Sequence, residues 1–214
     1  MDDKKNIAYI SVCLAFAAGF CDAATFTAAD ELFSAHVTGN FVVFAYDLIR
    51  GAEANSWLKL LSFPVFTIAV IIAGRFAPKL KSGYTLLLIE GLMLLVAGGL
   101  DIAFGRPGST WAAVMPYVVV LAMGLQNAFG RLYATAAYAP TTMMTGNVTQ
   151  LTLDIGKVLI PGVWNSDRRP AFAKQFIVIG GFLAGCLAGA FLAAHFGMFT
   201  VALPGVLLLL LFVI

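Results

Sequence analysis

The chain has 214 residues, of which 61% are hydrophobic and 11% are charged. Soluble domains average about 45–50% apolar and about 25% charged residues, so this composition excludes a soluble globular protein. It predicts an all-α integral membrane protein, whose spanning helices need about 20 residues each. The net charge of +2 does not indicate nucleic-acid binding. The three cysteines lack CxxC or CxxH spacing, so no disulfide framework, metal site or cofactor is expected.

The first half of the chain predicts three spanning helices and one shorter segment that begins with polar residues. These four segments lie at 7–26, 37–50, 58–76 and 84–104. We expect the first helix to be retained, because no small-residue cleavage site follows its apolar run. Asp22 and Glu90 lie within predicted spans. An ionisable group is costly against lipid, so both are predicted to face the protein interior as functional groups.

The second half repeats this order of segments. Its predicted helices lie at 111–131, 142–160, 174–197 and about 199–214. Within the third of them, Gly181, Gly185 and Gly189 recur every four residues, which permits close helix approach in lipid. We therefore predict a single transmembrane domain, residues 1–214, made of an internal repeat of about 7–104 and 111–214.

One short motif, T-G-N-x6-D-x2-(R/K), occurs twice, and its matched positions lie 107 residues apart (145 minus 38). The copies contain Thr38, Gly39, Asn40, Asp47 and Arg50, and Thr145, Gly146, Asn147, Asp154 and Lys157. A second match aligns GFCDA (19–23) with GLQNA (124–128), which places Asp22 against Gln126 and Asn127.

The residue types of the repeated motif suit the first turn of a helix that contacts a solute. Thr can cap a helix, Gly permits close approach, and Asn supplies donors and an acceptor. Two such starts near the midplane would present partial positive charge and free N–H groups. The candidate substrate-lining or coupling residues are Asp22, Thr38, Gly39, Asn40, Glu90, Gln126, Asn127, Thr145, Gly146 and Asn147. Asp47 with Arg50, and Asp154 with Lys157, are spaced as i, i+3 pairs, either as a gate or as ion pairs at helix ends.

Two topologies compete for the T-G-N segments. If they re-enter, six helices span and basic residues divide 10 to 3 in favour of the cytoplasm; if they cross, eight span and the division is 9 to 4. The first segment offers about 14 helical residues, roughly 21 Å, against a core of about 30 Å. The second is strongly polar. We therefore favour six spanning helices plus two short re-entrant helices, with a cytoplasmic N-terminus.

The residues AGFCDA (18–23), HVTGN (36–40), MGLQNA (123–128) and MTGN (144–147) carry a family resemblance. Through them the whole chain resembles the YoaK-like family of uncharacterised bacterial multi-pass membrane proteins. The resemblance implies a location in the bacterial inner membrane. It implies neither a substrate nor catalytic residues.

The sequence predicts a secondary transporter or channel for a small polar solute or ion. The alternative is a non-transporting membrane protein, such as a stress or assembly factor, in which the motif is structural. No G-x-S-x-G, H-E-x-x-H or Walker pattern occurs, so an enzyme is not expected. The expected partners are the lipid bilayer and the solute, with a homo-oligomer left open. His36 is interpreted as an incidental histidine near the membrane surface.

Overall fold

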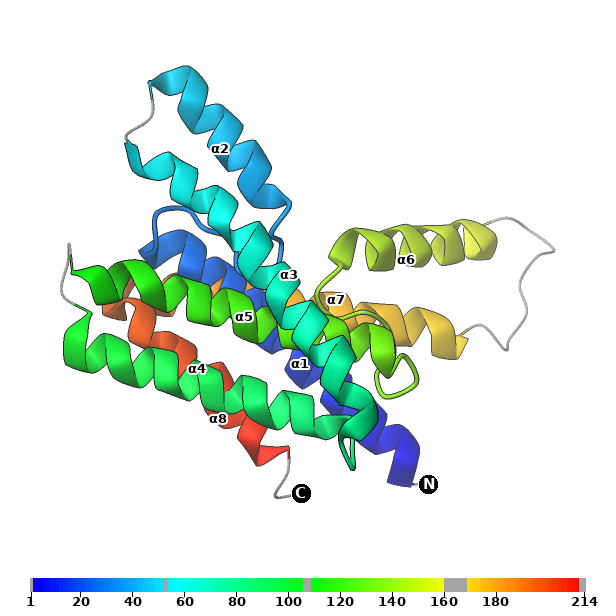
Figure 1. Cartoon of the computed structure of the whole chain (residues 1–214). Helices are drawn as coiled ribbons and strands as arrows, with labels where there is room; N and C mark the ends of the chain where they lie inside the picture. Colours follow the sequence, from blue (N-terminus) through cyan, green and yellow to red (C-terminus); the bar gives the residue numbers. More distant parts are fainter. Residues whose placement is uncertain (1, 52–53, 106–108, 160–168, 212–214) are drawn as a thin grey trace.

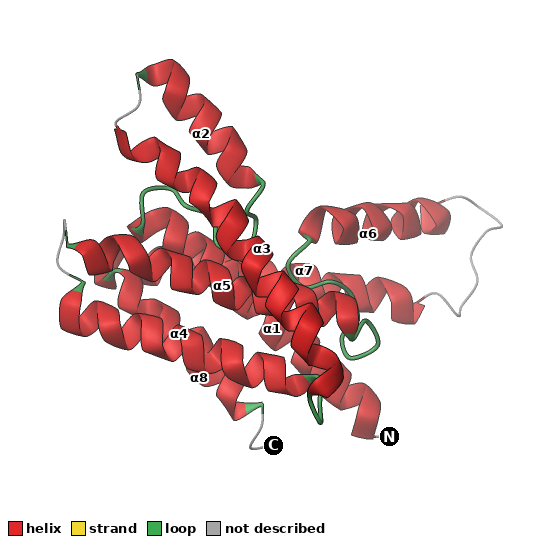
Figure 2. Ribbon diagram, viewed as in Figure 1, coloured by secondary structure: helices red, strands yellow, loops and turns green. Residues whose placement is uncertain are grey.

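The computed structural model describes residues 2–51, 54–105, 109–159 and 169–211, and every regular element among them is helical (Figure 2). The α-helices are α1 (Asp2–Ala28), α2 (Gly39–Arg50), α3 (Leu58–Phe76), α4 (Tyr84–Phe104), α5 (Thr110–Leu132), α6 (Met144–Leu159), α7 (Arg169–Phe196) and α8 (Ala202–Leu210). Short 3-10 turns lie at Ala54–Trp57, Ala77–Lys79 and Met198–Val201. The helical class predicted from composition is confirmed.

In the described part of the chain, five helices are long and apolar enough to cross a membrane. They are Ile7–Ala28, Leu58–Lys79, Tyr84–Phe104, Thr110–Leu132 and Phe172–Phe196. Helices satisfy their own backbone groups, which is what lipid requires of a spanning segment. The last predicted span differs from expectation, because it consists of a 3-10 turn and the nine-residue α8, and residues 212–214 lie outside the described part.

Glycines let α1 and α7 pack with their backbones in close contact. A Cβ atom on Gly185 would lie 2.1 Å from the carbonyl oxygen of Phe16, and one on Gly189 would lie 2.3 Å from that of Phe20. The same holds in reverse for Gly19 of α1, whose Cβ would lie 2.2 Å from the carbonyl oxygen of Phe182. The predicted close approach along the glycine stripe of α7 is confirmed.

The other helices assemble around this pair. α3 packs on α5, α4 packs on both α5 and α8, and α1 also contacts α5 and α8. Two helices project from this bundle in Figure 1: α2 lies along the start of α3, and α6 lies along the start of α7. Gly51 caps the end of α2: it has a left-handed conformation (φ +80°), and its N–H bonds to the carbonyl of Asp47. The side chain of Ile49, on the outer side of this helix, is 87% exposed, as expected of a surface that faces lipid.

One end of the bundle collects the ends of many elements around a pocket. The ends of α1, α4 and α7 and the starts of α3 and α5 all line it. Asp30, just after α1, and Arg50, the last residue of α2, line the same pocket. The segment 29–50 therefore leaves this end of the bundle and returns to it.

Candidate functional site

The loop between α1 and α2 folds back onto Asp22. This carboxylate is 3% exposed and accepts hydrogen bonds from the backbone N–H groups of Ala35 (2.5 Å) and His36 (3.3 Å), and from the Ser34 hydroxyl (3.4 Å). The His36 ring also bonds to Asp22 through Nδ1, and it packs edge-on against Phe182 of α7. The hydrogen bond to Asp22 raises the pKa of His36, although burial acts in the opposite direction. His36 is therefore bonded to a buried carboxylate, although its own side chain is 35% exposed, and it is not an incidental histidine.

Asn40 fixes the same loop from the other side. Its side-chain oxygen accepts the N–H of Phe33, and its nitrogen donates to the carbonyl of Phe33 and to the hydroxyl of Ser62, all at 2.8 Å. The side chain is fully buried. Asn40 thus joins the loop before α2 to α3, and each of its polar atoms has a partner in the chain.

The second half uses its matched residues in the same way. Asn147 donates to the carbonyl of Pro140 at 2.7 Å, across the same seven-residue separation as Asn40 and Phe33. Proline has no N–H, so the second bond made by Asn40 has no counterpart here. Asn127 donates to the hydroxyl of Thr142 at 2.9 Å.

Gln126 ties the same loop to the centre of the bundle. Its amide nitrogen donates at 2.8 Å to the hydroxyl of Thr141 and at 2.8 Å to the carbonyl of Leu14 on α1. Together with Asn127 it therefore holds the loop before α6 against α5, as Asp22 holds the loop before α2 against α1. The matched polar positions of the two halves fix corresponding loops.

The structure corrects the expected roles of threonine and glycine in the motif. The Thr38 side chain makes no capping hydrogen bond, and Thr145 lies inside α6, which begins at Met144. A Cβ on Gly39 would lie 2.9 Å from the Phe33 ring, so packing within the chain already favours glycine there. A Cβ on Gly146 would meet no neighbouring atom within 4 Å, so packing does not require glycine at that position.

Of the two predicted i, i+3 ion pairs, one forms. Lys157 lies 3.6 Å from Asp154, which also accepts a hydrogen bond from Gln150. The prediction of an Asp47–Arg50 pair is wrong, because Asp47 forms its ion pair with Lys59 of α3. Arg50 lies over the ring of Tyr46, 4.6 Å from its centroid.

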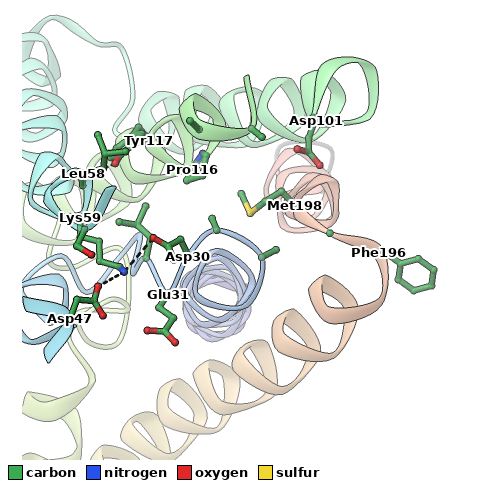
Figure 3. A pocket seen from close by; sticks show the side chains of 18 of the residues that line it. Asp30, Glu31, Asp47, Leu58, Lys59, Asp101, Pro116, Tyr117, Phe196 and Met198 are labelled. Carbon is green, nitrogen blue, oxygen red and sulfur yellow. Dashed lines mark hydrogen bonds and ion pairs between the residues drawn. The ribbon is translucent and has the colours of Figure 1, made fainter. Parts of the chain in front are cut away.

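Lys59 links three elements at the pocket. Its ammonium lies 2.6 Å from Asp47 of α2 and 3.3 Å from Asp30 in the loop after α1, and the residue is 4% exposed (Figure 3). The hydrogen bond from Lys59 lowers the pKa of Asp47. The pocket has a volume of about 910 Å³, and Asp101 lies on its far side from Lys59. Asp47 and Arg50 line it, whereas the T-G-N residues do not.

Glu90 lies apart from these contacts, in the first half of α4. It is fully buried, and neither of its carboxyl oxygens has a hydrogen-bond partner among the described residues. Within the described part of the chain, no three His, Cys, Asp or Glu side chains gather as ligands for a metal ion.

Sequence reasoning missed several partners of the predicted residues. They are Ser34, His36, Lys59, Ser62, Thr141 and Thr142. A signal for two of them was present, because the hydroxyl residues Ser34 and Thr141 are 107 positions apart, the same spacing as the motif (141 minus 34). Lys59 and Ser62 carry no such signal, since their roles depend on how α2 packs on α3.

The apolar helices and their buried polar contacts define an α-helical, multi-pass membrane protein. Residues 10–214 match the model of the family described as "Protein of unknown function (DUF1275)", and the chain belongs to that family. This confirms the resemblance seen in the paired T-G-N motifs. No curated protein and no solved structure matches the chain.

Proposed function

We propose that this protein is a secondary transporter or channel for a small polar solute or ion, and not an enzyme. One observation carries the proposal. Two helices, α2 and α6, begin inside the bundle after loops that are held by matched polar residues, Asn40 and Asn147 foremost. Interrupted segments at corresponding places in two halves are the best sequence-level indication of a transport site.

The arrangement of the helix ends supports a re-entrant α2. The segment 29–50 returns to the pocket end that it left. α7 ends at this pocket, so its start, which packs with α6, lies towards the opposite end. There Tyr138, in the loop before α6, accepts the Lys174 cation on its ring, and its N–H bonds to Ser11 near the start of α1. We infer six spans, with α2 and α6 entering from opposite sides.

The helix neighbours support a repeat of the two halves, which the opposite entry sides of α2 and α6 would make an inverted one. Exchanging the halves maps α1 to α5, α2 to α6, α3 to α7 and α4 to α8. The contact of α1 with α7 then becomes that of α5 with α3, and the contact of α4 with α5 becomes that of α8 with α1 (Figure 1). The contact of α2 with α3 likewise becomes that of α6 with α7. Inverted repeats with a site at their interface recur in secondary transporters.

In this proposal the N-terminus is cytoplasmic, the membrane is the bacterial inner membrane, and the pocket is the outward-facing entrance. Lys59 closes one wall of that entrance by holding α2 to the loop after α1. Because both partners of Lys59 lie on the segment that re-enters, we assign this triad as the gate in place of Asp47 and Arg50.

A second function rests on a different observation. Every polar atom of the Asn40 side chain is bonded within the chain, and no T-G-N residue lines the pocket. The motif would then hold loops in place in a membrane protein that transports nothing, such as a stress or assembly factor.

An accessibility experiment separates the two functions. In a variant without native cysteines, Ala113 at the pocket and Val42 on the exposed face of α2 are each changed to cysteine. Proteoliposomes are tested for uptake of labelled amino acids, organic acids, sugars, diamines and alkali cations. Transport predicts uptake that a thiol reagent blocks at position 113 and spares at position 42. No uptake of any panel member, with Asn40→Ala lowering only thermal stability, would favour the structural function.

A further inference from the structure

Glu90 is a buried acid, and no described residue donates a hydrogen bond to it. Leu87 and Leu94, which lie three and four positions from it on α4, are also fully buried. Residues at these spacings share one helix face, so the carboxyl lies in the apolar core. Neither oxygen receives a hydrogen bond from any described residue. Keeping a carboxyl group ionised in such apolar surroundings costs more free energy than protonating it, so Glu90 is neutral in this conformation.

Among the described residues, the elements packed against α4 place no cation beside Glu90. The 3-10 turn Met198–Val201 and α8 contain no titratable residue. On α5, Tyr117 bonds to the Leu58 carbonyl and Arg131 contacts Met143, each towards a different end of the helix. On α1, the titratable side chain close to Glu90 is the Cys21 thiol, which carries no positive charge.

A purely structural role does not explain this residue. A buried polar group without partners destabilises a fold, and leucine or methionine would fill the space without that loss. The adjoining residue, Gly91, lies where α4 crosses α8, and a Cβ on Gly205 would lie 2.8 Å from its carbonyl oxygen. The backbones therefore meet beside the carboxyl, and a shift at this crossing changes its surroundings directly.

We propose that Glu90 is a proton-binding site that exchanges its proton with water during the conformational cycle. The Glu90 carboxyl releases H⁺ to water when α4 and α8 shift, which leaves a carboxylate, and it regains H⁺ before the core closes. We assign this exchange the role of coupling solute movement to protons, and that role rests on the proposed transport function. The exchange itself does not.

Dicyclohexylcarbodiimide tests the exchange, because it adds as a whole to protonated carboxyls in apolar surroundings and needs no solute. The intact protein in lipid vesicles is labelled between about pH 5 and about pH 9, and adducts are located by mass spectrometry. We expect an adduct at Glu90 whose yield falls by about tenfold per pH unit above the point of proton release. Asp101→Asn, a second α4 carboxyl changed to its amide, should leave this profile unaltered, and Glu90→Gln should abolish it.

Absence of an adduct at Glu90 over the whole pH range, or a yield that does not change with pH, would overturn the proposal. These measurements use the wild-type protein, so they hold even if Glu90→Gln fails to fold. Solute uptake without labelling would leave transport standing and remove the proton site. Labelling that varies with pH, without uptake of any panel member, would leave the proton site standing and count against transport.

Discussion

At the scale of single residues, the polar side chains of the core hold loops to helices. Asp22 gathers the N–H groups of Ala35 and His36, while Asn40 and Asn147 reach back seven residues to a carbonyl. Such hydrogen bonds matter more in a membrane protein, because no lipid group replaces a lost partner. The two asparagines are unequal, since Asn40 makes three bonds to the chain within 2.8 Å and Asn147 makes one to a carbonyl.

This inequality predicts unequal losses of stability. Asn40→Ala leaves the N–H and the carbonyl of Phe33 without their side-chain partner and removes the donor to the Ser62 hydroxyl, so we expect a loss of about 2–3 kcal/mol in unfolding free energy. Asn147→Ala should lose about 1 kcal/mol. Thermal unfolding of the purified protein in detergent measures both, and Ser62→Ala serves as the control for one of the Asn40 bonds. Equal losses would show that the bonding pattern does not determine stability here.

The His36–Asp22 contact predicts a dependence of stability on pH. The folded-state pKa of His36 is raised above its ordinary value of 6.5, and Asp22 is the acidic partner that raises it. The contribution to stability is therefore complete below about pH 6.5 and is lost as pH rises through the raised pKa. The wild-type melting temperature should fall over this interval, and that of His36→Gln should not. His195→Gln is the matched control, because His195 bonds within its own helix; a wild-type slope retained in His36→Gln would contradict the assignment.

At the scale of elements, hydropathy predicted what lipid imposes and missed what tertiary packing decides. The predicted helices 58–76 and 84–104 match α3 and α4, because apolar runs of that length have few alternatives in a membrane. α1 and α7 extend further than predicted, since their polar ends continue the helix beyond the apolar run. The sequence could not predict that Asp47 pairs with Lys59 and not with Arg50, because this pairing depends on how α2 packs against α3.

Glycine positions give an element-scale prediction with opposite signs. Gly185→Ala places a Cβ against the backbone of Phe16, so α1 and α7 must separate, and we expect a loss of about 1–3 kcal/mol or more. Gly146→Ala meets nothing within 4 Å and lies in a helix, so it should gain up to about 1 kcal/mol. Thermal unfolding of the two variants beside wild type checks both signs. A loss of solute uptake in Gly146→Ala at undiminished stability would show that this glycine serves a solute and not the fold.

At the scale of the whole molecule, the proposed repeat pairs the helix contacts between the two halves of the chain. The glycine-lined contact of α1 with α7 has its partner in the contact of α5 with α3, where a Cβ on Gly124 would lie 2.6 Å from that of Ala69. The halves are therefore interlocked, since each supplies the helix against which the first helix of the other packs. A movement of one half against the other must pass through these two contacts, and the loops before α2 and α6 lie beside them.

The inverted six-span arrangement makes a prediction about sidedness. In a variant without native cysteines, single cysteines replace Glu31 and Arg50, which flank α2, and Lys79 at the far end of α3. Because segment 29–50 returns to the end it leaves, positions 31 and 50 should both react with an impermeant thiol reagent added to the periplasm. Position 79 should react only from the cytoplasm, the side on which we propose that the N-terminus lies.

The second half provides the matched test at the opposite face. Cysteines in place of Arg131 and Lys157, which flank the loop and α6, should both react from the cytoplasm. If α2 and α6 cross the membrane instead, the two members of each flanking pair will label from opposite sides and position 79 from the periplasm. That pattern would make eight spans and parallel halves, and it would remove the inverted repeat on which the transport proposal depends. The same-side pattern would leave α2 and α6 as two re-entrant helices that approach the core from opposite faces of the membrane.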